Sequence, residues 1–333
     1  MISQWRQWGI ALVGVLASAG GSADYRAHPE AQAFVSELVE EHGFQASRLE
    51  GWLSEAKRQE GILEAIARPA ERTRTWAEYR PIFLQSLRVQ RGIEFWRAHR
   101  DALARAEREL GVPPEIVLAI IGVETNYGRT TGSHRVIDAL STLAFDYPPR
   151  SPFFRKELAQ YFILMREHEQ NPLAFKGSYA GAMGYGQFMP SSYRHYAIDF
   201  DGDGFADIWN NPTDAIGSVA NYFAEHGWQR GAPVALRARA SDDLARGDAS
   251  DWNRIHPPEL TVADWAERGL TPIFPLPAEL PANALALEGD FGEEFWLAFH
   301  NFYVITRYNR SHLYALAVEQ LSKEIKTAME TEQ

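Results

Sequence analysis

The apolar positions of the first hundred residues recur with the spacing of amphipathic helices. Phe34 and Leu38 share one helical face, and Ile62 and Ile66 share another. A longer pattern of this kind extends from about Leu84 to Leu110 and predicts one long helix. These segments predict a helical region that packs on the rest of the protein.

The next helix differs because it has no polar face. Residues 116–123 are all nonpolar, and two prolines, Pro113 and Pro114, suit the start of a helix. Gly128 suits the left-handed residue that closes one. We therefore expect a buried helix that ends in a single acidic residue, Glu124.

Glu124 lies at the edge of this apolar packing, on the same side as Val117 and Ile120. Apolar surroundings disfavour the charged form of a carboxyl group and raise its pKa, which a general acid needs near neutral pH. A second interpretation is structural: Glu124 caps a neighbouring loop or pairs with an arginine such as Arg129 or Arg135. These residues alone leave both interpretations open.

Residues 177–193 contain four glycines interleaved with tyrosines, Gln187 and two methionines. This composition predicts a loop and a short helix in which the backbone is approached closely. No lysine follows the glycines at the position that a phosphate-binding loop requires. Tight packing against another helix and a substrate groove both fit the pattern.

Residues 199–210 match the beginning of an EF-hand calcium loop, with glycine at the sixth position. Asn210 replaces the glutamate that usually closes the coordination sphere, and an acidic residue four positions later could take its place. An acidic surface turn without an ion is the alternative. The expected Ca2+ ligands are Asp199, Asp201, Asp203, the backbone carbonyl of Phe205, and Asp214.

The periodicity changes again after residue 230. Residues 234–239 alternate between apolar and polar positions, residues 285–287 are a second strand candidate, and prolines recur between them. One short helical segment spans Val262 to Arg268. These features predict a small region that contains β-strands.

Residues 1–23 have the pattern of a secretory signal peptide. Arg6 precedes an apolar run from Trp8 to Leu16, and small residues allow cleavage after Ala19 or Ala23. An uncleaved anchor is the alternative, but the run is much shorter than the roughly 20 residues that a membrane span needs. We expect a soluble periplasmic protein after cleavage.

Composition further narrows the classes of protein to which the chain can belong. The formal net charge of −11 argues against nucleic-acid binding and against a polybasic mode of membrane attachment. The chain has no cysteine, which excludes disulfides, thiolate metal sites and lipid attachment at an N-terminal cysteine. Its 333 residues are 45% hydrophobic, so it can bury a substantial core.

Four blocks of this sequence together resemble the soluble form of the membrane-bound lytic murein transglycosylase B family. The blocks are residues 120–125, 177–193, 199–207 and 301–309. They occur in the same order as in the family, and the similarity extends over most of residues 30–325.

The resemblance implies a mainly α (α+β) fold with a lysozyme-like catalytic core, which agrees with the periodicities. The expected parts are a signal peptide (1–23), a helical domain (24–110) joined by the C-terminal helix (312–333), the catalytic core with its EF-hand-like loop (111–230), a small β domain (231–290), and a return to the core and cleft (291–311).

The resemblance also implies a reaction, the nonhydrolytic cleavage of the β-1,4 bond between MurNAc and GlcNAc in peptidoglycan that leaves 1,6-anhydroMurNAc ends. Glu124 would act first as the general acid and then as the base. Apart from Glu115 at the start of the helix, no second acid stands in this helix or in residues 177–193, whereas ordinary glycosidases use two. A hydrolytic muramidase and a noncatalytic peptidoglycan-binding protein stay open as alternatives.

Further roles carry over position by position. Two groove residues would hydrogen-bond the glycan, namely Ser178 and Gln187. The cleft would be lined by Tyr79, Tyr222, Tyr308, Asn309 and Tyr314, although core packing is the alternative for each tyrosine. Arg150 matches one member of an arginine pair that grips the stem peptide, and Pro149 replaces the other.

The implied cofactor is structural Ca2+, with no organic cofactor. The implied partners are peptidoglycan glycan strands and cell-wall synthesis proteins. Neither nucleic acid nor a stable membrane anchor is expected, and the protein would be a monomer.

Overall fold

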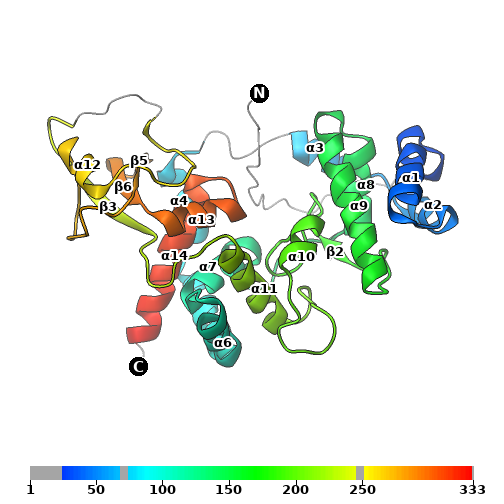
Figure 1. Cartoon of the computed structure of the whole chain (residues 1–333), viewed down its shortest axis with the longest axis horizontal. Helices are drawn as coiled ribbons and strands as arrows, with labels where there is room; N and C mark the ends of the chain where they lie inside the picture. The colour runs from blue at the N-terminus through cyan, green and yellow to red at the C-terminus, as the bar shows by residue number, and fades with distance from the viewer. Residues whose placement is uncertain (1–24, 68–73, 245–250, 332–333) are drawn as a thin grey trace. The chain divides into compact units, whose positions relative to one another are not determined.

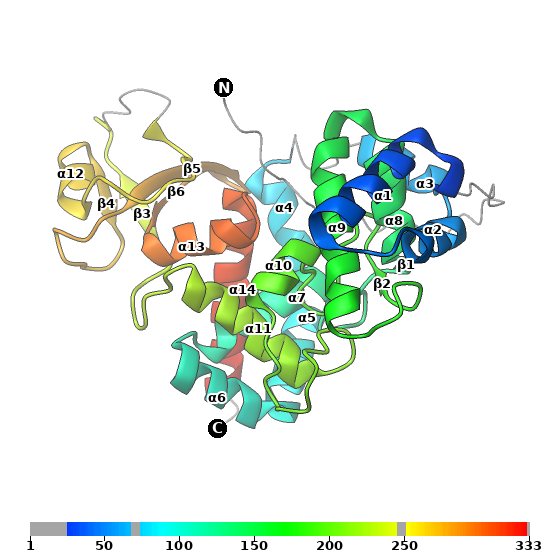
Figure 2. The ribbon, with the colours of Figure 1, turned by 45° about the vertical axis from the view of Figure 1, so that its right-hand side comes forward.

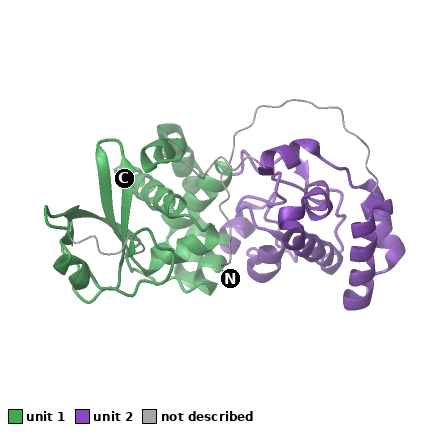
Figure 3. Ribbon diagram, turned by 90° about the horizontal axis from the view of Figure 1, so that it is seen from above, with its two compact units in different colours: residues 1–10, 71–127, 219–333 green, residues 11–70, 128–218 purple. Residues whose placement is uncertain are grey.

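The computed structural model describes residues 25–67, 74–244 and 251–331, so the expected signal peptide lies outside the described residues. The chain forms two compact units, which Figure 3 colours separately. As far as they are described, unit 1 takes in residues 71–127 and 219–333, and unit 2 takes in residues 11–70 and 128–218. The two units divide the expected helical domain of residues 24–110 between them, and the expected domain boundaries stay a prediction.

Unit 2 is mostly helical. Its elements, most of which are labelled in Figure 1, are η1 (Tyr25–Ala27), α1 (Pro29–His42), α2 (Ala46–Glu55), α3 (Glu60–Ala67), β1 (His134–Arg135), α8 (Val136–Phe145), η2 (Pro148–Arg150), α9 (Ser151–Glu167), β2 (Lys176–Gly177), α10 (Pro190–Tyr196) and the first half of α11 (Pro212–Glu225). Helices α8 and α9 pack along each other through fully buried side chains such as Leu143 and Leu158 (Figure 2). The two short strands pair antiparallel, with His134 opposite Gly177.

The start of α9 shows how a proline acts in this fold. Pro152 lies in the first turn, where its missing N–H costs no hydrogen bond. The helix includes Ser151, and Arg150 takes the cap position, so the Ser151 side chain does not serve as the N-cap. The Ser151 hydroxyl instead donates to the carbonyl of Ala144, which ties α9 to the end of α8.

Unit 1 contains the buried helix and the β region. Its helices are α4 (Trp76–Phe83), α5 (Ser86–Ala98), α6 (Arg100–Leu110), α7 (Pro114–Thr125), the second half of α11, α12 (Val262–Glu267), α13 (His300–Tyr308) and α14 (His312–Thr331). Helix α14 packs against α4, α5, α7 and α13, so the C-terminal helix holds this unit together.

The prediction of a single helix between Leu84 and Leu110 is wrong, because the structure has two helices that meet at His99. His99 leaves the helical conformation at φ −123° and ψ 30°, although its N–H still bonds the carbonyl of Phe95. Its ring lies against that of Phe95, with 4.4 Å between the ring centroids. Neither proline nor glycine marks the break, so the amphipathic pattern continues across it.

The β region is one antiparallel sheet in the order β4-β3-β6-β5. Its strands are β3 (Ala235–Ala240), β4 (Leu270–Pro272), β5 (Asn283–Gly289) and β6 (Gly292–Ala298). The two expected strands correspond to β3 and β5, and the sheet continues through β6 beyond residue 290.

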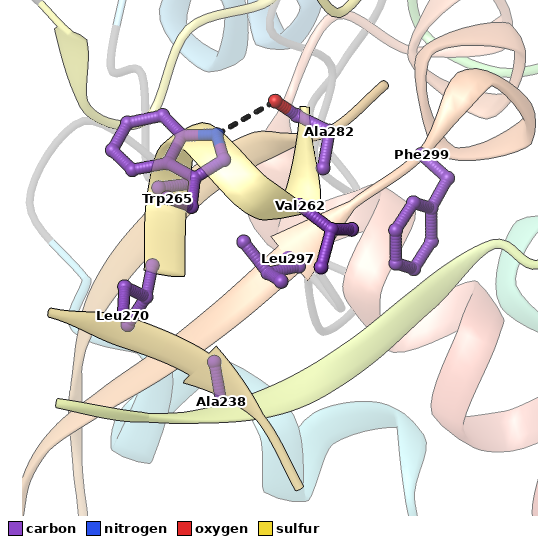
Figure 4. Close-up of a cluster of buried hydrophobic side chains, with 8 residues drawn as sticks. Ala238, Val262, Trp265, Leu270, Ala282, Leu297 and Phe299 are labelled. Carbon is purple, nitrogen blue, oxygen red and sulfur yellow. Dashed lines mark hydrogen bonds between the residues drawn. The ribbon is translucent and has the colours of Figure 1, made fainter. Parts of the chain in front are cut away.

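Helix α12 covers one face of this sheet with apolar side chains (Figure 4). Trp265 is fully buried there, and its indole N–H donates to the carbonyl of Ala282 at 2.8 Å. Leu297 and Phe299 complete the same cluster. Since Phe299 directly precedes α13, this cluster fixes where the chain leaves the sheet and returns to the helices of unit 1. Among the described helices, none is long and apolar enough to cross a membrane.

Candidate active site

Glu124 stands in the last turn of α7, a helix whose side chains are nearly all buried. Val117 and Ile120 are fully buried, whereas Glu124 is half-buried. Thr125 is also fully buried, and its hydroxyl donates to the carbonyl of Ile121 at 3.1 Å. The expected position of Glu124 at the edge of apolar packing is therefore confirmed, while the expected rise of its pKa stays a prediction.

The end of α7 differs from the expected one. The helix closes at Asn126, which adopts the left-handed conformation at φ 50°, two residues before Gly128. Tyr127 and Gly128 continue in the same region at φ 60° and 80°. Three left-handed residues in a row turn the chain sharply away from the carboxyl group, and two of them carry side chains that disfavour this conformation.

Two tyrosines of unit 1 lie close to Glu124. The Tyr314 hydroxyl, in the first turn of α14, donates to Glu124 Oε1 at 2.6 Å. Burial raises the pKa of Tyr308 and of Tyr314, and the negative charge of Glu124 raises both further. Both hydroxyls therefore stay protonated near neutral pH, and Tyr314 serves as a hydrogen-bond donor to the carboxyl group.

The other expected cleft residues of unit 1 belong to the same cluster. The rings of Tyr222 and Tyr308 are 4.7 Å apart, and the Tyr222 hydroxyl donates to the carbonyl of Arg307 at 2.6 Å. Tyr79 on α4 is close enough to Tyr314 to raise its pKa. Asn309, which follows Tyr308 at the end of α13, is buried. The structure thus brings Glu124, Tyr79, Tyr222, Tyr308, Asn309 and Tyr314 together in one unit.

His226 is a member of this cluster that the sequence analysis missed. Its ring stacks on Tyr222 with 4.0 Å between centroids, and its Nδ1 bonds the carbonyl of Tyr222 at 2.7 Å. Burial lowers the pKa of His226, so the ring is neutral at pH 7. The available signal was the spacing of Tyr222 and His226 on one helix, four residues apart.

The glycine-rich segment lies in unit 2 and forms a loop followed by α10, as expected. Its glycines make close backbone contacts: a Cβ atom on Gly177 would lie 2.2 Å from the carbonyl oxygen of Ala182, and one on Gly184 would lie 2.3 Å from that of Ile208. Packing therefore explains why glycine is needed at these two positions. A substrate groove along the loop stays a prediction.

Ser178 and Gln187 use their side chains within this loop. The Ser178 hydroxyl accepts the N–H groups of Ala180 and Ala182 at 3.3 and 3.0 Å. The Gln187 amide nitrogen donates to the carbonyls of Thr131 and Gly184 at 3.1 and 2.9 Å. These bonds fix the shape of the loop, and the Ser178 hydroxyl still has its own proton to donate.

Arg150 lies at the start of α9, beside two aromatic rings. Its guanidinium carbon is 4.7 Å from the ring centre of Phe153 and 5.1 Å from that of Phe154. Burial lowers the pKa of Arg150, but an arginine stays charged at neutral pH. The two rings hold this cation in one place, which suits a contact with an anionic group.

The expected metal ligands also lie in unit 2. Four carboxylates offer oxygen atoms that all lie within 4.8 Å of one another: Asp199, Asp201, Asp203 and Asp214. Asp207 is outside this group. Its Oδ1 accepts the N–H groups of Trp209 and Asn210 at 3.0 and 2.9 Å. The acid that joins the cluster is thus Asp214, the residue expected to replace the usual glutamate.

The environment of Asp214 fits a bound cation. It is fully buried, and its two oxygens accept the N–H groups of Phe200, Asp201 and Asp207. Burial raises the pKa of Asp214, and the negative charge of Asp201 raises it further against the effect of the N–H groups. A hard cation with oxygen ligands would offset this accumulated negative charge, and Ca2+ has that preference.

A mainly helical fold with a single carboxyl group at the end of a buried helix defines a lysozyme-like, glycoside-cleaving enzyme. The family model described as the transglycosylase SLT domain matches residues 26–323, and the chain belongs to this family. The chain is 43% identical over 314 residues to membrane-bound lytic murein transglycosylase B of Escherichia coli strain K12. The aligned region covers 92% of this chain and 85% of that protein.

Solved structures agree with this family assignment. The soluble lytic transglycosylase SltB1 of Pseudomonas aeruginosa is 51% identical with a TM-score of 0.85 and covers 91% of this chain and 100% of that one. The Escherichia coli lytic transglycosylase SLT35 in complex with calcium is 43% identical with a TM-score of 0.84, and the match covers 93% of this chain and 97% of that one. SltB3 of Pseudomonas aeruginosa, in complex with NAG-anhNAM-pentapeptide, is 31% identical with a TM-score of 0.80, and the match covers 89% of this chain and 78% of that one. The protein is therefore a lytic murein transglycosylase, and its mainly α fold and its family, both predicted from the sequence, are confirmed.

Proposed function

We propose that this enzyme cleaves the MurNAc-β-1,4-GlcNAc bond without water and leaves 1,6-anhydroMurNAc ends, with Glu124 as both acid and base. The observation that carries the proposal is the 2.6 Å bond from the Tyr314 hydroxyl to Glu124 Oε1 at the end of the buried helix α7. The complex of SltB3 with NAG-anhNAM-pentapeptide, a ligand that contains an anhydro sugar, supports the same chemistry.

The proposed reaction uses one carboxyl group twice. Glu124 in its acid form gives a proton to the glycosidic oxygen as the bond to the anomeric carbon breaks. The resulting carboxylate takes the proton of the MurNAc 6-hydroxyl, whose oxygen forms the new bond to the anomeric carbon. Tyr314 holds one carboxyl oxygen and thereby orients the group for both steps.

A hydrolase of the usual kind needs a second carboxylate, either about 5 Å or about 6.5–9.5 Å from the first. The other acid of α7, Glu115, lies at the opposite end of the helix and pairs with Lys326 at 2.9 Å. This arrangement favours a single acid over a pair.

The products test the proposal. Purified sacculi are digested with the enzyme, and the released muropeptides are analysed by mass spectrometry. We expect anhydromuropeptides, each lighter by one water than the corresponding reducing-end product. Dominant reducing ends would support a hydrolytic muramidase instead, and binding without release would support a noncatalytic protein.

We further propose that Ser178, Gln187 and Arg150 contact the glycan and its stem peptide, together with the tyrosines of the cluster. The hydroxyl proton of Ser178 and the cation of Arg150 support this assignment. The signal-peptide pattern and the peptidoglycan substrate of the family support a soluble, monomeric periplasmic enzyme, with cell-wall synthesis proteins as further partners.

Ca2+ is proposed as a structural ion of the acidic cluster, supported by the four convergent carboxylates and by the calcium complex of SLT35. Added Ca2+ is therefore expected to raise the Tm, and chelation by EDTA to lower it. At a concentration of 100 Kd the ion would add about 2.7 kcal/mol, which corresponds to a Tm shift of roughly 4 °C for a chain of this length. Differential scanning calorimetry measures the shift, and a Tm that responds to neither reagent would count against the site.

Tyr314→Phe tests the hydrogen bond to Glu124. The variant loses the donor to Oε1, so the carboxylate that forms in the first step loses a stabilising bond. We expect kcat to fall by about tenfold, which corresponds to roughly 1.4 kcal/mol, and the alkaline limb of the pH–rate profile, where Glu124 loses its acid form, to move to higher pH. Tyr303→Phe, a change on the neighbouring helix α13, is the control. An unchanged pH profile in the Tyr314 variant would remove this bond from the mechanism.

A further inference from the structure

The backbone directly after Glu124 is held in an unfavourable conformation. Asn126 and Tyr127 both have positive φ angles, 50° and 60°. Asparagine adopts this region readily at the end of a helix, whereas the bulky Tyr127 does so at a cost on the order of 1–2 kcal/mol. Such a conformation persists only where the surroundings fix it. What fixes it therefore also fixes the direction in which the last turn of α7 presents Glu124.

The Tyr127 side chain fills a slot between α5 and α7. A Cβ atom on Gly122 would lie 2.6 Å from the Tyr127 hydroxyl oxygen and 2.7 Å from its ring carbon Cζ. A Cβ atom on Gly92 of α5 would also lie 2.6 Å from that oxygen. Two glycines on facing helices thus make the room that the end of this ring occupies.

The ring is held firmly in the slot. Tyr127 is 7% exposed, and its ring centroid is 5.8 Å from that of Phe95. Its hydroxyl has no hydrogen-bond partner within the described part of the chain, so packing rather than a hydrogen bond retains it. The aromatic body is the essential part of the side chain.

Arg88 of α5 supports the same turn from the other side. Its guanidinium donates to the carbonyl of Gly122, which also accepts the N–H of Asn126 at 3.0 Å. The Tyr127 N–H bonds the carbonyl of Ile121 at 3.3 Å. The last turn of α7 is therefore joined to α5 by one side-chain hydrogen bond and by one inserted ring.

We propose that Tyr127 is a positioning residue for Glu124: its ring, inserted between Gly92 and Gly122, holds the left-handed turn that sets the direction of the catalytic carboxyl group. This inference rests on the proposed role of Glu124. It assigns Tyr127 no contact with the substrate, only the orientation of the helix end.

Tyr127→Gly and Asn126→Gly are a matched pair that tests the proposal. Glycine adopts positive φ angles without strain, so both changes relax the backbone, but only Tyr127→Gly empties the slot. We expect Tyr127→Gly to lower kcat by about 10–100-fold with KM for soluble glycan strands changed less than about threefold. Asn126→Gly should keep kcat within about twofold.

Two further variants keep the test decisive if Tyr127→Gly does not fold. Tyr127→Phe retains the ring and should recover kcat to within about threefold. Gly122→Ala gains helix propensity, but its methyl group would displace the buried Tyr127 ring, so kcat should fall about tenfold and the Tm should fall as well. A structural role alone would also lower Tm and kcat together, so the pH–rate profile decides between the two.

The pH–rate profile adds a readout that lost stability would not move. If the carboxyl group turns away from Tyr314, the alkaline limb of the kcat profile should shift to higher pH in Tyr127→Gly and Gly122→Ala and stay in place in Asn126→Gly. Wild-type kcat in both displaced-ring variants would overturn the inference. An active Glu124→Gln variant would instead overturn the proposed function, so the two failures are distinguishable.

Discussion

Glu124→Gln is expected to reduce the release of muropeptides by on the order of 10³-fold or more, since general acid and base catalysis contributes roughly 10²–10⁴-fold and Glu124 is proposed to serve in both steps. Glutamine keeps the size of the side chain and can still accept the Tyr314 hydrogen bond. Folding and glycan binding should therefore persist. The measurement combines a muropeptide assay with sedimentation of the variant on sacculi.

Glu115→Gln is the matched control, because Glu115 lies in the first turn of the same helix. Its carboxylate forms an ion pair with Lys326 at 2.9 Å, and Lys326 is half-exposed. Such a pair contributes only about 0–1 kcal/mol, so activity should stay at the wild-type level. Wild-type release by Glu124→Gln would remove this residue from the chemistry.

Much of the helix that carries Glu124 could be predicted from the sequence. An uninterrupted apolar run behind two prolines has few other solutions, and the structure confirms a buried α7 that begins at Pro114. The closing residue was harder to predict, because Gly128 was the obvious left-handed residue while Asn126 and Tyr127 needed a tertiary contact to enter that region. That contact, the slot between two helices, has no signature in the local sequence.

Strand β6 shows the same limit. Its sequence, Gly-Glu-Glu-Phe-Trp-Leu-Ala, continues into the aromatic residues of α13, and no proline or glycine separates the two. The strand exists because it pairs with both β3 and β5 in the middle of the sheet. β5 is joined to β6 by only two residues, Asp290 and Phe291, but β3 ends at Ala240, and this distant pairing cannot be deduced from local periodicity.

The tyrosines of the site were predicted through the family resemblance and not through spacing. Tyr314 stands 190 residues after Glu124, and only the packing of α14 on α7 brings the two side chains within 2.6 Å. Core packing was the alternative for each tyrosine, and both interpretations hold in part: Tyr314 is 2% exposed and still directs its hydroxyl at the carboxyl group.

Asp214→Ala is expected to have the largest effect on stability. Its carboxylate accepts three backbone N–H groups, from Phe200, Asp201 and Asp207, and is itself fully buried. The Phe200 N–H is buried and the other two are partly buried. A buried donor left unsatisfied costs about 1–3 kcal/mol, so a total loss of roughly 3 kcal/mol is expected even if part of the loop relaxes. The Tm without Ca2+ should fall by about 4–5 °C.

Asp203→Ala separates the metal from this structural role. Asp203 belongs to the same carboxylate cluster but is exposed, and its Oδ1 accepts the N–H of Phe205 at 3.0 Å. We expect it to lose most of the Tm increase on Ca2+ addition while its Tm in EDTA stays within about 2 °C of the wild type, since exposed substitutions change stability by about 0.5 kcal/mol. Asp214→Ala should lose both the Ca2+ response and the metal-free stability. If the two variants behave alike in EDTA, the three N–H bonds of Asp214 do not stabilise the loop, and its burial would serve the ion alone.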